Sequence, residues 1–186
     1  MTSHAGYQLM AIAALLGCIV LRWVTDALPA WWLPVPIAIT LLGVPLAATD
    51  LRQRRLPNAL TLSAIGVTAC VLVAVAVSAG TAAVLGAAAW GGVSLTSAHL
   101  AVYLVAPGSL GGGDVKLATS VGAVLGAVGW QAVLLGMLLA SSVAFLLGVA
   151  ARVLRRPAWR DGVPYGPGLL AATWAIAVFP WQWSWA

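Results

Sequence analysis

Apolar stretches separated by short polar segments run along the whole chain, and their lengths predict membrane-spanning helices. A bilayer core about 30 Å thick is crossed by roughly 20 mostly apolar residues in a helix. Segments that approach this length cover residues 7–24, 31–49, 59–79, 82–105, 115–130, 131–151 and 167–185. The pattern therefore predicts an all-α fold, a polytopic transmembrane bundle of about seven helices.

The segments follow one another without a linker, a low-complexity tract or a soluble stretch of any size. Residues 1–186 are therefore interpreted as a single integral membrane domain. Residues 1–30 add an N-terminal helix and an outer loop, without the basic start and cleavage site of a removable signal peptide. The fifth segment is short and rich in small residues such as Gly122 and Gly126. Because small residues let helices approach closely, we expect this segment at the centre of the bundle.

Composition supports membrane embedding and argues against a nucleic-acid partner. Charged residues make up only 7% of the chain and the mean hydropathy is +1.03. A soluble domain carries about 25% charged residues. The net charge of +5 comes mainly from two short clusters between apolar segments: Arg52, Arg54, Arg55 and Arg152, Arg155, Arg156, Arg160. Such clusters are typical of cytoplasmic loops, so no nucleic-acid binding is expected.

Placing both arginine clusters in the cytoplasm sets the direction of every helix. The N-terminus then lies in the cytoplasm and the C-terminus outside, in a multi-pass protein of the plasma (cytoplasmic) membrane. The segments 82–105 and 115–130 meet on the cytoplasmic side. Tryptophans favour membrane interfaces, and those expected at the outer interface are Trp23, Trp31, Trp32, Trp130, Trp181, Trp183 and Trp185.

Two of the four acidic residues lie where an apolar segment meets the predicted cytoplasmic face. Asp50 ends the second segment, and Asp114 directly precedes the fifth. Asp26, in an outer loop, and Asp161, among arginines, are explained by solvent and by local charge balance. Simpler explanations also exist for the first two, since aspartate is a good helix N-cap and Asp50 is followed closely by arginines. Their shared position at one face favours a common role.

Two carboxyl groups that share one proton provide the chemistry for hydrolysing a peptide bond. One acts as base on a water molecule, while the other polarises the scissile carbonyl or protonates the leaving amine. Residues 111–113 are all glycine, so no side chain shields Asp114, and glycine permits backbone φ values closed to other residues. This reaction needs neither a cofactor nor a metal. The isolated Cys18 and Cys70 form no zinc or redox motif.

Three short motifs, in the same order and at the same predicted membrane face, resemble those of the type IV prepilin peptidases. The first is Asp50-Leu-Arg-Gln-Arg-Arg-Leu-Pro57-Asn58, similar to the family's aspartate, basic spacer and Leu-Pro-Asn block. The second is Gly111-Gly-Gly113-Asp114-Val-Lys116-Leu117, similar to its GxGDxKL signature. The third is Val163-Pro164-Tyr165-Gly166-Pro167, similar to its PxGP element. The resemblance covers roughly residues 31–185, which we interpret as the peptidase core.

The resemblance implies an aspartic endopeptidase with Asp50 and Asp114 as its catalytic pair. Its substrates would be prepilins or pseudopilins, whose short basic leader is cut just after a glycine at the cytoplasmic side. Many members also carry an insertion with two CxxC pairs and methylate the new N-terminus. Because no CxxC pair occurs in this sequence, N-methyltransferase activity is not expected. Membrane lipid is the other expected partner, and the oligomeric state is left open.

Residues that flank the pair are expected to support the site or bind substrate: Gly111, Gly113, Lys116, Pro57, Asn58, Pro164, Gly166 and Pro167. The Pro-Asn pair suits the start of the third helix, with proline in the first turn and asparagine as cap. The Pro-Tyr-Gly-Pro element suits a bend before the last helix. Lys116 either contacts substrate or tunes the pair, or anchors its helix at the interface. His99 is expected to make a hydrogen bond between helices.

Other functions use similar residues. A small ion- or proton-coupled carrier also places acids in the membrane, usually near the midplane and within internal repeats. Here both acids lie at one edge and no repeat is found. A catalytically silent pilus-assembly protein would not need both aspartates. Presenilin-like proteases share the GxGD element, but their Pro-Ala-Leu motif is missing, and Pro-Tyr-Gly-Pro stands in its place.

Overall fold

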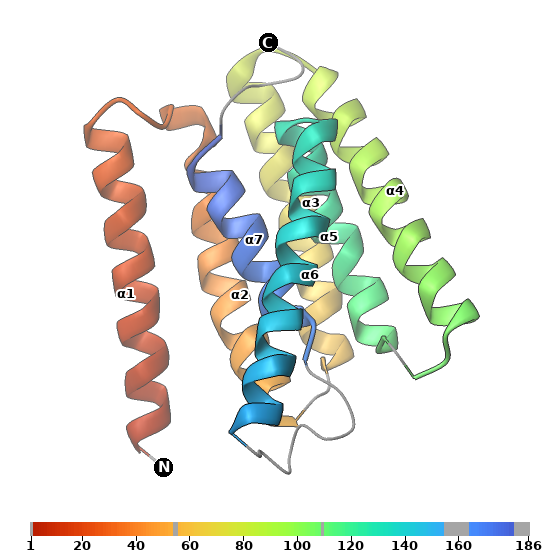
Figure 1. Ribbon diagram of the computed structural model, residues 1–186. Helices are drawn as coiled ribbons and strands as arrows, with labels where there is room; N and C mark the ends of the chain where they lie inside the picture. The colour runs from red at the N-terminus through yellow and green to blue at the C-terminus, as the bar shows by residue number, and fades with distance from the viewer. Residues whose placement is uncertain (1, 54–55, 109, 155–163, 181–186) are drawn as a thin grey trace.

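The computed structural model describes residues 2–53, 56–108, 110–154 and 164–180, and these form an all-α bundle (Figure 1). The helices are α1 (Thr2–Val24), α2 (Pro34–Gln53), α3 (Asn58–Ala79), α4 (Ala83–Val105), α5 (Gly112–Val128), α6 (Trp130–Val153) and α7 (Gly166–Val178). A short 3₁₀ turn, η1 (Ala30–Trp32), precedes α2. The predicted fold class is confirmed, with seven helices in the described part of the chain.

Five of these helices, α1, α2, α3, α4 and α6, are long and apolar enough to cross a membrane. The last helix is shorter than the predicted segment 167–185. It has 13 residues and ends at Val178, which at 1.5 Å per residue covers only about 20 Å. The cause is Pro180, because a proline disfavours helical backbone in the residue before it. Phe179 indeed has φ −121° and ψ 57°. Residues 181–186 lie outside the described chain.

Successive helices run in opposite directions, so the bundle has two distinct ends (Figure 1). One end holds the start of α1, the end of α2 with the start of α3, and the end of α4 with the start of α5. The end of α6 and the start of α7 meet there too, whereas α7 finishes at the opposite end. Helix α1 lies at the margin and packs on α2. The helix ends that flank the loops expected in the cytoplasm therefore share one end of the bundle.

Helix α5 lies at the centre, as its small residues predict, and contacts α3, α4, α6 and α7. Its closest partner is α4. A β-carbon added to Gly122 would lie 2.6 Å from the carbonyl oxygen of Gly91, and one added to Gly91 would lie 2.5 Å from the α-carbon of Gly126. Only glycine fits at such a crossing. The hydroxyls of Thr96 and Thr119, 2.9 Å apart, add a hydrogen bond between the two helices.

Helices α2 and α7 pack side by side in opposite directions, and two tryptophans fix how they are aligned. The Trp32 indole N–H donates to the carbonyl oxygen of Ala177 at 2.9 Å, near the end of α7. Further along, the Trp174 indole N–H donates to the Thr40 hydroxyl at 2.9 Å. This alignment carries the last turn of α2 to the first turn of α7, and so places Asp50 beside the start of α7.

The tryptophans expected near the outer interface differ in burial. The side chain of Trp32 is fully buried inside the bundle, where its bond to Ala177 satisfies the indole N–H. Trp23 and Trp130 are exposed at 46% and 60%. Their position at a membrane interface stays a prediction. The tryptophans at 181, 183 and 185 lie outside the described residues.

Candidate active site

The two aspartates predicted to act together meet at the first residue of α7. A β-carbon added to Gly166 would lie 2.7 Å from Asp50 Oδ2 and 3.6 Å from Asp114 Oδ1. Two points at 2.7 and 3.6 Å from a third are at most the sum of these distances apart, so the oxygens lie within roughly 6 Å of each other. Asp50 is 5% exposed, in the last turn of α2. The structure thus brings together two carboxyl groups from distant parts of the sequence.

One oxygen of the Asp114 carboxyl group accepts a hydrogen bond, and the other is buried without one. Oδ2 accepts a hydrogen bond from the N–H of Gly111 at 3.0 Å. Oδ1, the oxygen nearer to Gly166, is buried and has no hydrogen-bond partner among the described residues. The N-cap of α5 is Gly111 rather than Asp114, so the interpretation of Asp114 as the N-cap is wrong. Its bond to Gly111 instead fixes the direction of the carboxyl group.

Burial also favours the protonated form of Asp114, which lies ahead of the predicted membrane segment 115–130. Desolvation raises the pKa of its carboxyl above the ordinary value of 3.8, and the bond from Gly111 lowers it by less. Burial raises the pKa of the nearby Tyr165 hydroxyl, a bond to Ser141 lowers it, and the charge of Asp114 raises it. Burial therefore lets this carboxyl group keep its proton to a higher pH than an exposed aspartate does.

The simpler explanation for Asp50, pairing with the arginines that follow it, is tested only in part. Arg52 is exposed, whereas the Asp50 carboxylate points into the bundle toward Gly166. Arg54 and Arg55 lie outside the described residues, as do residues 155–163, which hold the second arginine cluster and Asp161. A shared proton requires carboxyl oxygens about 3 Å apart, a distance that lies within the limit set by their contacts with Gly166.

The glycines before Asp114 are explained by packing rather than by unusual backbone angles. Gly111 has an extended backbone with φ −81°, and the next two residues belong to α5. The φ values that glycine alone permits are therefore not adopted at residues 111–113. A β-carbon on Gly113 would lie 2.7 Å from Leu56 Cβ and 3.3 Å from the Leu56 carbonyl oxygen. One on Gly112 would meet nothing within 4 Å.

Lys116 and Asn58 connect the same two segments at the surface. The Lys116 ammonium donates to the side-chain oxygen of Asn58 at 2.7 Å, and both residues are exposed. Pro57 is the N-cap of α3 and Asn58 its first helical residue, the reverse of the expected order. The first and second motifs are therefore neighbours, joined by this bond and by the contact between Leu56 and Gly113. A role of Lys116 in substrate binding stays a prediction.

The third motif contains Gly166, the residue that lies next to both aspartates. Pro164 is buried, Tyr165 is the N-cap of α7, and α7 begins at Gly166. Pro167 stands in the first turn, where its missing N–H costs no helix hydrogen bond. The expected bend before the last helix thus coincides with the meeting point of the carboxyl groups.

Tyr165 is the neighbour of the pair that sequence reasoning did not single out. Its ring packs against the buried His99 of α4, with ring centroids 5.5 Å apart. His99 was expected to bond between helices, but its Nδ1–H donates to the Leu95 carbonyl of its own helix at 2.9 Å. The contact that His99 makes with another segment is the packing of its ring on Tyr165, before α7. Nothing in the spacing of the sequence predicts that these two residues meet.

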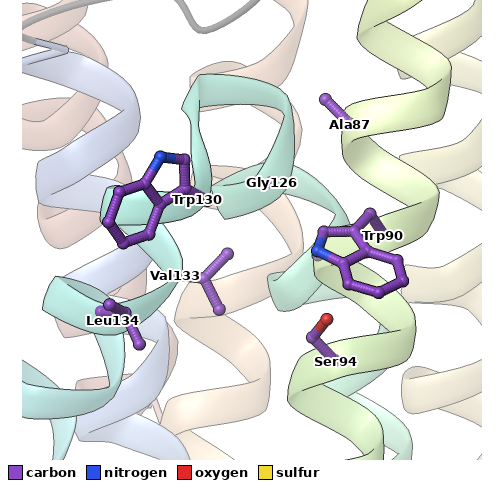
Figure 2. A pocket seen from close by; sticks show the side chains of 8 residues that line it. Ala87, Trp90, Ser94, Gly126, Trp130, Val133 and Leu134 are labelled. Carbon is purple, nitrogen blue, oxygen red and sulfur yellow. The ribbon is translucent and has the colours of Figure 1, made fainter.

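A separate cavity of about 330 Å³ lies between α4, α5 and α6 (Figure 2). It is lined by Ala87, Trp90, Gly91, Ser94, Gly126, Trp130, Val133 and Leu134. Gly126 is three helical turns from Asp114, which is about 18 Å along α5. The lining holds no acidic or basic side chain, so this cavity has no part in acid–base chemistry. The described residues also contain no cluster of three or more potential metal ligands among His, Cys, Asp and Glu.

An apolar helical bundle with two neighbouring carboxyl groups at one end defines a multi-pass membrane protein with a paired-aspartate site. The chain belongs to the type IV leader peptidase family, whose model matches residues 37–149. This confirms the resemblance found in the three motifs.

Two relatives are each described as a prepilin leader peptidase/N-methyltransferase. The protein from Aeromonas hydrophila is 35% identical over 148 residues, which is 78% of this chain and 49% of the relative. The protein from Aeromonas salmonicida (strain A449) is 34% identical over 173 residues, which is 91% of this chain and 57% of the relative. The chain thus spans about half the length of the curated relatives it matches. No solved structure matches it.

Proposed function

We propose that this protein is a membrane aspartic endopeptidase that removes the short basic leader of type IV prepilin-like proteins. The observation that carries the proposal is the meeting of Asp50 and Asp114 beside Gly166. Membership of the leader peptidase family and the description of the Aeromonas relatives support the reaction and its substrates. The site lies at the end of the bundle that the arginine clusters assign to the cytoplasm, with the N-terminus inside and the C-terminus outside.

In the resting site the two carboxyl groups share one proton. The ionised group takes a proton from a water molecule, whose oxygen bonds to the scissile carbonyl carbon. The protonated group gives its proton to the carbonyl oxygen, which yields a geminal diol. The first group then protonates the leaving nitrogen as the carbon–nitrogen bond breaks, and the second recovers a proton from one diol hydroxyl. A carboxylic acid and an amine leave, and the pair again holds one proton.

Leader removal in membranes tests this proposal. The chain is expressed with a candidate prepilin, and the loss of the leader is followed on a gel. Asp50→Asn and Asp114→Asn are each expected to abolish processing at unchanged protein level. Asp26→Asn is the matched control, because it makes the same chemical change at an exposed acid. Its φ of 55° is one that asparagine accepts readily. Full cleavage by Asp50→Asn or Asp114→Asn would rule out the two-aspartate mechanism.

The same membranes test the chemical form of the product and the alternative function as a carrier. The mass of the released mature protein is expected to show an unmodified N-terminal amine, since the sequence holds no CxxC pair. A product heavier by one methyl group contradicts that prediction. Movement of a proton or a small ion across vesicles, without any cleavage, would favour a carrier over a peptidase.

A further inference from the structure

A second cavity, of about 190 Å³, is lined by α2 and α7 and bounded on one side by α1, and it is called here the α2–α7 groove. Helix α2 lies between α1 and α7 (Figure 1). At one end the groove is lined by Ala47, about one helical turn before Asp50, and by Pro167, which directly follows Gly166. From there it follows the contact between α2 and α7 as far as Trp174. The groove thus continues from the candidate active site along the bundle.

The lining of the groove offers no polar group to an occupant. None of the described residues that line it is charged. The Trp174 indole N–H donates to the Thr40 hydroxyl at 2.9 Å, and this hydroxyl donates to the Pro36 carbonyl oxygen at 2.7 Å. A charged or strongly polar occupant would lose its hydration there without gaining a hydrogen bond. The groove therefore suits an apolar occupant.

Small residues on both helices give the groove its depth. Gly43 and Ala47 are four residues apart on α2, and the exposed Ala171 lines the groove from α7. This spacing of small residues lets helices approach closely within a membrane. Packing of α2 on α7 does not require the glycine, because a β-carbon added to Gly43 would lie 3.5 Å from Leu170 Cδ2, an ordinary contact. The missing side chains instead leave space for those of another helix.

The size of the groove and the position of α1 determine how much of a helix it can receive. A helix with its side chains is about 10–12 Å across, so a groove of about 190 Å³ takes the side chains of one helix face. Leu15 of α1 lines the other side. Beyond Trp174, the Arg22 guanidinium of α1 donates to the Val178 carbonyl oxygen at 3.3 Å and lies 4.6 Å from the ring centre of Phe179. These contacts join α1 to α7 at the end of the groove remote from the aspartates.

We propose that the α2–α7 groove binds an apolar helical segment of the substrate, the part of its chain that follows the scissile bond. The groove begins at the aspartate pair, so its occupant is continuous with the peptide bond that the pair cuts. Because charges are costly inside a membrane, the basic leader of the proposed substrates does not lie in an uncharged groove. The segment on the other side of the cut lies there instead. The inference rests on the proposed peptidase activity and adds the surface that selects its substrates.

The length of the groove indicates which part of the segment it contacts. Thr40, at the far end, lies ten residues before Asp50 on α2, which is about 15 Å along the helix. A substrate helix rises by the same 1.5 Å per residue. The residues that contact the groove should therefore lie within about ten positions after the scissile bond.

Two peptide substrates test the groove by kinetics. The long peptide carries the leader and an apolar segment of about 20 residues, enough to cross a membrane, whereas the short peptide ends just after the cut. The parent protein is expected to prefer the long peptide, as measured by the ratio of the two kcat/KM values. Ala171→Leu places a larger side chain in the groove at an exposed position. It should lower this preference about tenfold or more, the scale on which small size changes act in an apolar pocket.

Ala74→Leu is the matched control, because it makes the same change at an exposed residue of α3 that does not line the groove. It should keep the preference of the parent protein. Equal preferences in Ala171→Leu and Ala74→Leu would overturn the inference, as would be found if a lipid chain filled the groove. If the parent protein cuts neither peptide, the proposed function fails and the groove assignment with it. If it cuts both peptides without preference, only the groove assignment fails.

Photo-crosslinking measures occupancy of the groove without cleavage. A photo-reactive phenylalanine analogue is placed at residue 171 in Asp50→Asn, which is expected to hold the long substrate uncut. A crosslink is expected to a substrate residue within about ten positions after the scissile bond. The same analogue at residue 134, which lines the separate cavity between α4, α5 and α6 (Figure 2), should give none. A crosslink from residue 134 but not from residue 171 would overturn the proposal.

Discussion

Replacing Gly113 by alanine perturbs the contact that joins the first two motifs. The added β-carbon would lie 2.7 Å from Leu56 Cβ, 3.3 Å from its carbonyl oxygen and 3.5 Å from its α-carbon. An unstrained contact between carbon atoms is about 3.5–4.0 Å, so the two segments must separate by about 1 Å. Because Leu56 presents its backbone and first side-chain atom, no change of rotamer relieves the clash.

The expected cost follows from two opposing effects. Overpacking of this kind costs about 1–3 kcal/mol, while alanine in place of glycine within a helix stabilises by about 0.5–1 kcal/mol. Gly113→Ala should therefore lower the free energy of unfolding by about 1–2 kcal/mol. Gly112→Ala has no clash within 4 Å and should raise it by about 0.5–1 kcal/mol. Adjacent glycines are thus expected to respond with opposite sign.

Thermal unfolding of the purified protein in detergent, followed by circular dichroism, measures this difference. The parent protein and both variants are compared at one pH and one detergent concentration. Leader cleavage is measured on the same samples, and it should fall in Gly113→Ala because Asp114 is the next residue. A shift of both variants in the same direction and by the same amount would refute the packing explanation for Gly113.

Three other predictions follow from contacts at and around the site. Gly91→Leu should prevent the bundle from forming, because its side chain would enter the backbone of α5 at Gly126; the yield of folded protein in gel filtration measures this, and normal yield contradicts it. Lys116→Met and Asn58→Ala should each cost about 1 kcal/mol or less at this exposed position, and their combined effect should be smaller than the sum, since they remove one bond. The pKa of Asp114 is raised in the folded protein, so the folded state binds this proton more tightly than the unfolded state. The stability of the folded protein that comes from this difference is fully present below the ordinary pKa of 3.8 and is lost as pH rises through the folded-state pKa. Relative to Asp114→Asn, the melting temperature of the parent protein should therefore fall as pH rises above the ordinary value of 3.8, and equal slopes would contradict the raised pKa.

The sequence predicts the bundle well because its main signals are local. Segment lengths follow from bilayer thickness, and the small residues of segment 115–130 correctly predict a central helix in close contact with α4. The last helix was overestimated because apolar residues continue past Val178, while a single proline at 180 ends the helix. A count of apolar residues does not include that backbone effect.

The site was predictable in part for a similar reason. Asp50 and Asp114 stand out because acids are rare at a membrane boundary, and topology places them at one end. Their approach at Gly166 depends on how α2 and α7 are aligned, which the bonds of Trp32 and Trp174 determine. The contact between Gly113 and Leu56 likewise depends on tertiary packing. Such contacts join residues far apart in sequence and leave no periodic signal.

The dependence of the pair on α7 has a consequence for biosynthesis. Asp50 and Asp114 enter the membrane with α2 and α5, long before Gly166 leaves the ribosome. Until α7 packs against α2 and α5, the two carboxyl groups lack the contact with Gly166 that they share. On the proposed mechanism, the site of a newly made chain is therefore complete only when α7 has docked against α2 and α5.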